Sequence, residues 1–280
     1  MNELVDKQTA RAMAPWVHRL ARYGYAAKGA VYIVVGGLAL QAALGSGGET
    51  TDTEGALRAI FRQPFGALLL LIVGVGLFSY TAWRVTQSIF DVEGKGSGFH
   101  GLLKRFGYLV SGIAYGGLGV SALRQVIGLA ATGGRSQEDW TQLVLAHPFG
   151  RWLVIAAGLV LAALAINAAV VALGRMYRRK LMRDEMSDAA WNWAASLAVI
   201  GMLARGMVFG LLAVFFIQAG WDRNANQAGG LSDVLVAIAA QPQGPWLLGT
   251  MAAGLVAYGL YAEVEARYRR IPLDSRRGSK

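Results

Sequence analysis

The chain has 280 residues, of which 55% are hydrophobic and only 16% charged, and its formal net charge is +10. This composition is too apolar for an ordinary soluble domain and is typical of an integral membrane protein. The absence of cysteine excludes disulfides, thiolate-bound metals and cysteine nucleophiles.

Six apolar runs account for the composition, and each is close to the ~20 residues that a helix needs to cross ~30 Å of hydrocarbon. They lie approximately at residues 22–44, 65–90, 106–130, 150–174, 194–220 and 246–264. Six such runs leave no amphipathic layer that could bury them, so we expect all six to span a membrane. The first run is long enough to stay in the bilayer as an anchor, so we expect no cleaved signal peptide.

Three connections share one design, in which a small polar residue precedes a short amphipathic turn and a proline then precedes the next span. The expected helix starts are Asp52 or Thr53, Ser136 and Ser232, and the prolines are Pro64, Pro148 and Pro242. A small polar residue caps a helix, and proline fits a first helical turn. We therefore expect three short interfacial helices, with the prolines opening the even-numbered spans.

The other two connections are different. Residues 91–99 are Gly-rich and are expected to form a flexible turn, whereas residues 175–188 are dense in mixed charge. The charged run is expected to be a solvated surface, and a helical extension of the fourth span remains the alternative.

Basic residues alternate between the connections. Residues 1–23, 91–105, 175–192 and 264–280 hold 18 Lys and Arg, whereas the alternate connections hold four: Arg58, Arg62, Arg135 and Arg223. Cytoplasmic loops carry the excess of positive charge, so both termini are expected in the cytoplasm. The charge therefore indicates topology and attraction to anionic lipid headgroups rather than nucleic-acid binding.

One motif occurs three times and opens each odd-numbered span. Its copies are Gly24, Lys28, Gly29 and Tyr32; Gly107, Ser111, Gly112 and Tyr115; and Gly201, Arg205, Gly206 and Phe209. We therefore predict an all-α membrane protein of six transmembrane helices, arranged as three two-helix repeats with pseudo-threefold symmetry. The expected repeats are residues 16–91, 104–177 and 193–270 of a single domain, 1–280.

Ionisable residues inside a span are costly and indicate function. Lys28 and Arg205 occupy the same repeat position, with Ser111 in the second repeat. Two interpretations are open: the long side chains snorkel to the headgroups, or the three residues surround a basic, cytoplasm-facing cavity. Either Glu263 or Glu265 is expected to pair with Arg205, as a structural ion pair rather than a proton relay.

Repeats differ at Trp83, Arg84 and Gln87 in the second span and at Asn167 in the fourth, and substrate selectivity is expected to lie at these positions. The candidate substrate-binding residues are Lys28, Ser111, Arg205, Glu263, Glu265, Tyr32, Trp83, Asn167 and Tyr258.

Catalytic signals are weak. The histidines His18, His100 and His147 lack the spacing of a metal or haem site, and no phosphate loop, nucleophile elbow or dinucleotide motif is present. We expect neither a metal, a cofactor nor an enzyme; only the group of Glu263, Glu265 and Arg205 could supply acid–base chemistry.

Over essentially its whole length the chain resembles a family of bacterial inner-membrane proteins of unknown function with three two-helix repeats. The match rests on Gly24, Gly29, Tyr32, Pro64-Phe65-Gly66, Tyr80, Trp83, Arg205-Gly206, Pro242, Gly244 and Glu265-Ala266-Arg267-Tyr268-Arg269. The resemblance implies the fold and a multi-pass inner-membrane location, and it implies no activity. Repeat two departs most, with Ser111 in place of a base and Asn167 in place of an aromatic.

The leading functional hypothesis is a protein that binds or transports a small anionic solute or a lipid headgroup through its basic positions. The alternative is a non-transporting scaffold or envelope-stress protein that docks lipids or partner subunits. The sequence leaves a homo-oligomer open.

Overall fold

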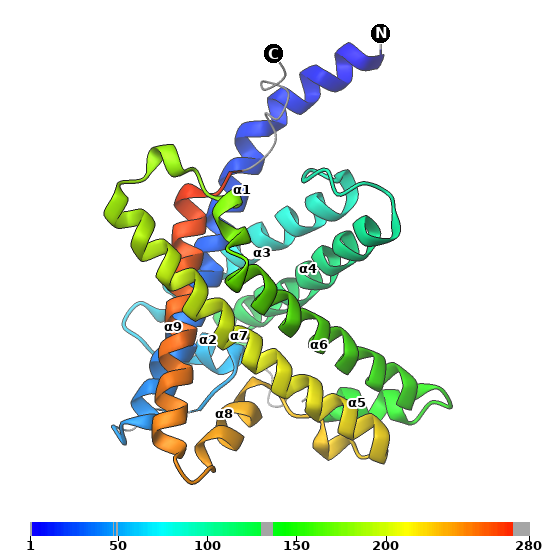
Figure 1. Cartoon of the computed structure of the whole chain (residues 1–280), viewed down its shortest axis with the longest axis vertical. Helices are drawn as coiled ribbons and strands as arrows, with labels where there is room; N and C mark the ends of the chain where they lie inside the picture. The colour runs from blue at the N-terminus through cyan, green and yellow to red at the C-terminus, as the bar shows by residue number, and fades with distance from the viewer. Residues whose placement is uncertain (1, 47, 49, 130–136, 271–280) are drawn as a thin grey trace.

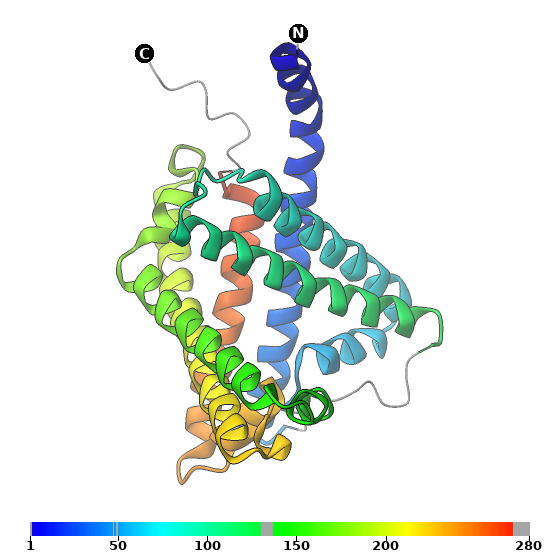
Figure 2. The same ribbon diagram turned by 90° about the vertical axis from the view of Figure 1, so that its right-hand side faces the viewer.

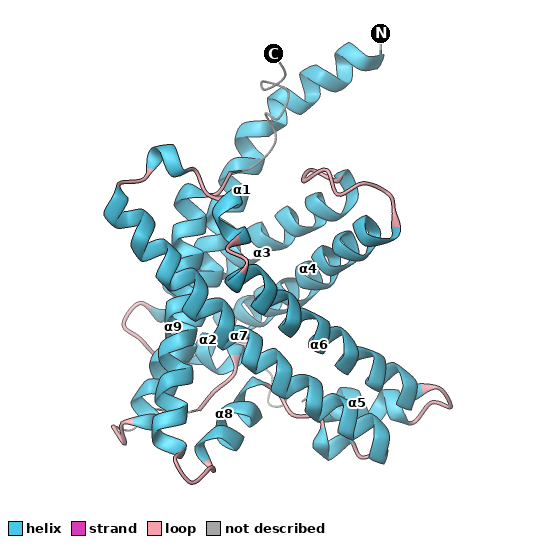
Figure 3. Cartoon of the chain, in the orientation of Figure 1, coloured by secondary structure: helices cyan, strands magenta, loops and turns pink. Residues whose placement is uncertain are grey.

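The computed structural model describes residues 2–46, 48, 50–129 and 137–270 (Figure 1). These residues form an all-α structure, coloured by secondary structure in Figure 3. The helices are α1 (Asn2–Ala43), α2 (Thr53–Phe61), α3 (Gly66–Phe90), α4 (Phe99–Val126), α5 (Gln137–Leu145), α6 (Gly150–Leu173), α7 (Asp188–Asp222), α8 (Leu231–Ala239) and α9 (Gly244–Tyr268), with short 3-10 turns η1 (Met176–Lys180), η2 (Arg183–Glu185) and η3 (Ala225–Gln227).

Six of these helices are long and apolar enough to cross a membrane: α1, α3, α4, α6, α7 and α9. The six predicted spans are therefore confirmed, and the chain is a multi-pass membrane protein. In α1 the apolar part covers His18–Ala43, and the helix continues without a break through the polar N-terminal segment, which projects from the bundle (Figure 1).

The long helices are arranged as three pairs of antiparallel neighbours. The most extensive contacts join helices of different repeats, α1 with α9, α3 with α4 and α6 with α7. In Figure 2, α1 and α9 lie between the α3–α4 pair and the α6–α7 pair. The same type of contact thus occurs three times around the bundle, as three two-helix repeats require.

The two ends of the bundle differ. The N-terminal part of α1, the C-terminal end of α9 and the connections after α3 and α6 lie at one end, called here the terminal end, and α2, α5 and α8 lie at the other (Figures 1 and 2). At the terminal end, Leu181 forms an antiparallel bridge with Arg269. The backbone N–H of Met182 also donates to the carbonyl of Tyr268 at 2.8 Å. The run 175–188 is therefore tied to the end of α9, and its alternative interpretation as an extension of α6, which ends at Leu173, was wrong.

The three short helices were predicted correctly, but not all of their starts. Asp52 caps α2, since its carboxylate accepts a hydrogen bond from the backbone N–H of Gly55 at 2.7 Å. Ser136 lies outside the described residues. Ser232 does not cap α8, which begins one residue earlier; the Asp233 carboxylate accepts from the N–H of Gly230 at 2.6 Å instead. A carboxylate in the first turn can reach back to the chain entering the helix, which serine is too short to do.

The prolines lie in the turns before the even spans, not in their first helical turns, and glycine opens each span. At Gly66, Gly150 and Gly244 a Cβ would lie less than 3.0 Å from a backbone carbonyl of the preceding short helix. Only glycine allows that approach. The repeated Pro-x-Gly signal therefore encodes a tight turn that fixes each short helix against the span that follows.

Candidate functional site

Two cations from different helices meet at one tyrosine inside the bundle. The Nζ of Lys28 on α1 donates a hydrogen bond to the hydroxyl oxygen of Tyr258 on α9 at 2.5 Å. The Nη1 of Arg205 on α7 donates to the same oxygen at 2.7 Å. The two nitrogens are thus about 5 Å apart or closer. At an effective dielectric constant of about 20, two unit charges at this separation repel each other by on the order of 3 kcal/mol.

This axial cation pair, Lys28 and Arg205, lies deep in the bundle. Lys28 is ten residues into its span, and Tyr258 is ten residues from the end of α9. At 1.5 Å per residue this depth is about 15 Å, which is half of a hydrocarbon layer of about 30 Å. Lys28 is only 3% exposed, so the interpretation that it snorkels to the headgroups was wrong. Arg205 is only partly buried.

Aromatic rings surround the axial cation pair. The Nζ of Lys28 lies 4.7 Å from the ring centroid of Tyr258 and 5.5 Å from that of Tyr80. The guanidinium carbon of Arg205 lies 4.6 Å from the ring centroid of Phe209 and 4.9 Å from that of Tyr258. A desolvated cation gains about 2 kcal/mol from a ring face. The rings therefore offset part of the desolvation penalty without neutralising either charge.

Among the described residues, no carboxylate forms an ion pair with Lys28 or Arg205. The expectation that Glu263 or Glu265 pairs with Arg205 was wrong. Glu265 pairs instead with Arg269, four residues further along α9. Because it lies seven residues beyond Tyr258, it is about 10 Å closer to the terminal end than the phenol that Arg205 contacts. Glu263 packs against Gly29 on α1.

The acidic groups form a separate network at the terminal end, centred on Glu93 in the connection between α3 and α4. Its carboxylate accepts hydrogen bonds from Gln87 at 2.6 Å, from Tyr108 at 2.8 Å and from Arg269 at 3.1 Å. These donors belong to α3, to α4 and to the end of α9, so the network joins all three repeats. Arg269 also pairs with Glu265, so this arginine has two carboxylate partners.

The pKa of Glu93 follows from these contacts. Burial by itself would raise the pKa of the carboxyl, but the Arg269 guanidinium and the Tyr108 hydroxyl outweigh burial and lower the pKa to about 2. Glu93 is therefore ionised at neutral pH. Unlike the axial cation pair, the terminal network contains its own counterions.

Two residues near the site, Tyr80 and Glu93, were not among the predicted candidates. Tyr80 accepts a hydrogen bond from Arg84 Nε at 2.8 Å, and Arg84 also donates to Gln87 at 2.9 Å. Tyr80 follows Pro64 by the same interval as Tyr258 follows Pro242, so the repeat register could have identified it. The role of Glu93 has no comparable sequence signal. Glu93 meets Arg269 only because of the way the connection between α3 and α4 folds.

The other predicted residues are placed as follows. The ring of Tyr32 packs edge-on against that of Tyr258, with centroids 4.8 Å apart, and Trp83 is buried. Asn167 is exposed on α6. Ser111 makes no hydrogen bond to either axial cation within the described part of the chain. The structure thus brings Lys28, Arg205, Tyr258 and Tyr32 together and leaves Ser111 and Asn167 outside that cluster.

Several hydrogen-bonding groups around the cluster are buried without a partner in the described protein. They are the hydroxyls of Tyr25 and Tyr261, the indole N–H of Trp83 and the Nε–H of Arg205. Buried polar groups are normally paired. Unused donors and acceptors therefore lie among the buried side chains of the bundle interior, as well as on Arg205 itself.

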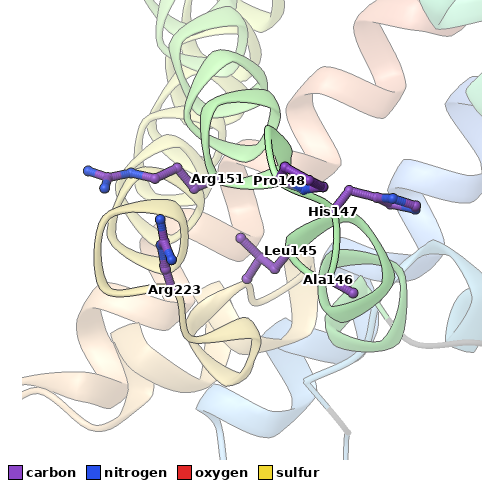
Figure 4. Close-up of a pocket in the computed structure, with 6 residues that line it drawn as sticks. All are labelled: Leu145, Ala146, His147, Pro148, Arg151 and Arg223. Carbon is purple, nitrogen blue, oxygen red and sulfur yellow. The ribbon is translucent and has the colours of Figure 1, made fainter.

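A hollow of about 220 Å³ lies at the opposite end, lined by Leu145, Ala146, His147, Pro148, Arg151 and Arg223 (Figure 4). His147 points away from Arg151 there. The hollow is far from the axial cation pair and shares no residue with it. Within the described residues, no group of three or more His, Asp or Glu side chains could hold a metal ion.

Comparisons with known proteins agree with the repeat structure. The family model described as "Domain of Unknown Function (DUF1206)" matches three times, over residues 23–91, 106–175 and 200–269. The chain is also 33% identical over 257 residues to an uncharacterized protein, YxxB, of Bacillus subtilis (strain 168), covering 92% of this chain and 93% of that protein. No solved structure matches the chain significantly. The three matches fall on α1 and α3, on α4 and α6, and on α7 and α9, and together they cover most of the sequence, so the chain belongs to the DUF1206 family.

Proposed function

We propose that this membrane protein binds a small anion, either a solute or a lipid headgroup, at Lys28, Arg205 and Tyr258. One observation carries the proposal: the buried Lys28 and the partly buried Arg205 share a single phenolic oxygen, and no described carboxylate pairs with either. An uncompensated charge inside a membrane protein is strongly unfavourable. An anion between the two groups removes their mutual repulsion and supplies the missing charge.

The donors present favour an oxyanion such as phosphate or sulfate. Arg205 uses Nη1 for Tyr258, and its Nε–H has no partner within the described chain. A guanidinium binds phosphate through two parallel N–H groups, whereas an ammonium acts as a compact point charge. Arg205 therefore supplies the directional contacts, and Lys28 supplies the second charge.

The charge distribution supports an orientation for the site. With 18 Lys and Arg in the connections and tails at the terminal end, we place that end in the cytoplasm of a bacterial inner membrane. Sites near the bilayer midplane, between repeats, are a common design in transporters. A depth of about 15 Å from the terminal end supports transport as the activity, with membrane lipids as the surrounding partners.

The test is thermal unfolding of the detergent-purified protein with increasing inorganic phosphate or sulfate. A ligand at about 100 times its Kd stabilises the folded state by about 2.7 kcal/mol, so we expect the melting temperature to rise by several degrees. Lys28→Met and Arg205→Gln should remove that rise. Arg124→Gln is the matched control, because this arginine is exposed at the end of α4. An equal rise in all four proteins would reject the site.

The scaffold hypothesis keeps one supporting observation. Lys28 is sealed by tyrosine rings and the core continues through α1 and α9, a packed interior that a non-transporting protein also requires. Flux of phosphate into liposomes, compared for the native protein and Arg205→Gln, separates the two. Binding without flux supports a lipid or anion sensor, and flux that depends on Arg205 supports transport.

A further inference from the structure

The two spans of repeat two do not pack together as those of the other repeats do. In repeats one and three, a Cβ at Gly24 or Gly201 would lie less than 3.0 Å from the backbone of Tyr80 or Tyr258 on the following span. The third copy of this glycine, Gly107, has no atom of another segment within 4 Å. Helices α4 and α6 accordingly make almost no contact with each other. In Figure 2 they diverge, and α1 and α9 come into view between them.

The sequence explains this separation. Leu164 and Asn167 on α6 occupy the repeat positions that hold Tyr80 and Trp83 on α3. Repeat two therefore lacks the two aromatic side chains that fill the inside of the hairpin elsewhere. We call the open side the seam, bounded by Gly107, Ser111 and Ala114 on α4 and by Leu164 and Asn167 on α6. Leu164, Asn167 and Ala114 are exposed.

The seam lies beside the partly buried member of the axial cation pair. Gly206, next to Arg205, packs against α6. A Cβ at this position would lie 3.3 Å from the carbonyl oxygen of Ala165 and 3.3 Å from the Cβ of Ala168. On the α4 side, the Tyr115 ring lies 4.7 Å from that of Tyr80. Tyr115 is also close enough to Arg205 to interact with it electrostatically. The part of α7 that carries Arg205 thus lies against α6 on one side and beside Tyr115 of α4 on the other.

The seam carries two polar side chains, Ser111 and Asn167, in an otherwise apolar environment. Only 11% of the most apolar stretch of α6 is buried, against 56% for α9, so α6 faces mostly lipid. Asn167 and Ser111 place an amide and a hydroxyl there, and a polar group left unpaired in hydrocarbon is costly. The occupant that suits this surface has both a polar and an apolar part.

We propose that the seam admits one anionic phospholipid from the bilayer, with its phosphodiester at Arg205 and Lys28 and its acyl chains along α4 and α6. The proposal rests on the proposed anion site and names its ligand. The route of entry is inferred from the packing around the site. The Glu93 network joins the three repeats across the terminal end, and tyrosine rings cover Lys28 from within the bundle, whereas the hairpin of repeat two is unfilled.

The test is native mass spectrometry of delipidated protein titrated with phosphatidylglycerol or with phosphatidylcholine, alongside thermal shifts with inorganic phosphate. We expect one phosphatidylglycerol to bind at least about tenfold more tightly than phosphatidylcholine, a difference of about 1.4 kcal/mol. Ala114→Trp fills the seam and should abolish this preference while leaving the phosphate shift intact. Ile113→Trp is the matched control, because Ile113 is 66% exposed but points to another side of α4. Arg205→Gln should abolish both effects.

The outcomes separate the two proposals. A phosphate shift that depends on Arg205, together with equal binding of both lipids or no effect of Ala114→Trp, overturns lateral lipid entry and leaves the anion site standing. If the native protein shows neither a thermal shift with phosphate nor a preference for phosphatidylglycerol, the anion site itself is overturned. If Ala114→Trp instead converts a dimer to a monomer without changing lipid preference, a second copy covers the seam, and the lipid proposal is wrong.

Discussion

Lys28 and Arg205 belong to different repeats and donate hydrogen bonds to the same oxygen atom, the hydroxyl of Tyr258. They occupy equivalent positions in the first and third copies of one motif, so both cations come from the same position of the repeat. The Glu265 carboxylate lies about two helical turns along α9 from Tyr258 and pairs with Arg269 instead. The two positive charges therefore have no counterion among the described residues, and an anion between them would neutralise them.

The first prediction concerns the shared phenol. Tyr258→Phe removes the one oxygen in the described part of the chain to which both axial cations donate, and leaving buried donors unsatisfied costs about 1–3 kcal/mol. We expect this loss in the free energy of unfolding, and we expect a smaller loss when Lys28→Met is already present. A double-mutant cycle measured by denaturant unfolding in detergent gives the coupling. Tyr32→Phe is the control, because the Tyr32 ring packs against Tyr258 and no hydrogen bond among the described residues joins its hydroxyl to either axial cation. Additive effects of Tyr258→Phe and Lys28→Met would contradict the shared contact.

The second prediction uses the three equivalent glycines as a matched series. Gly24→Ala and Gly201→Ala place a methyl group against the backbone of the next span, and we expect each to destabilise the protein by at least about 1–3 kcal/mol. Gly107→Ala meets open space. It should be neutral or stabilise by up to about 1 kcal/mol, because alanine is the better helix former. Equal losses at all three positions would show that α4 and α6 pack closely after all.

The third prediction is a pH dependence from the terminal network. The pKa of Glu93 is lowered from 4.5 to about 2 in the folded protein. A lowered folded-state pKa stabilises the protein fully above about 4.5, and this stability is lost as the pH falls toward 2. The contribution is on the order of 3 kcal/mol.

The measurement is the melting temperature between pH 7 and pH 3. Glu93→Gln should lower it at neutral pH and flatten its fall on acidification. Asp184→Asn, at a carboxylate that is 91% exposed, should leave the profile unchanged. An unaltered profile for Glu93→Gln would exclude the network as its cause.

The fourth prediction is the topology, and the absence of cysteine makes it simple to test. Ser97→Cys lies in the connection at the terminal end, and Ser46→Cys lies in the first connection at the opposite end; both serines are exposed. On intact cells, a membrane-impermeant maleimide should label Ser46→Cys and should label Ser97→Cys only after lysis. The reverse pattern would place the termini outside the cytoplasm.

Much of the fold follows from the sequence because the bilayer imposes simple rules. Apolar runs of the right length became six long helices, and the Gly-x-x-x-polar-Gly motif gave the three repeats. The Pro-x-Gly signal was located correctly, but its physical role was different. Position 66 must be glycine because a Cβ there would collide with the carbonyl oxygen of Phe61 on α2. No sequence pattern reveals that contact.

The site was only half predictable. The repeat register pointed to Lys28 and Arg205, because a charge in an apolar run is conspicuous at any position. Their common partner depends on how α1, α7 and α9 cross, and the capture of Glu265 by Arg269 depends on where α9 ends. The separation of α4 from α6 could have been inferred from Leu164 and Asn167, since repeat two lacks the aromatic side chains that close the other hairpins.

The most direct measurement is isothermal titration calorimetry of the detergent-purified protein with inorganic phosphate. We predict saturable binding with one site per chain, lost in both Lys28→Met and Arg205→Gln and retained in Arg124→Gln. Binding that is absent from the native protein, or that persists unchanged when both axial cations are replaced, would contradict the account.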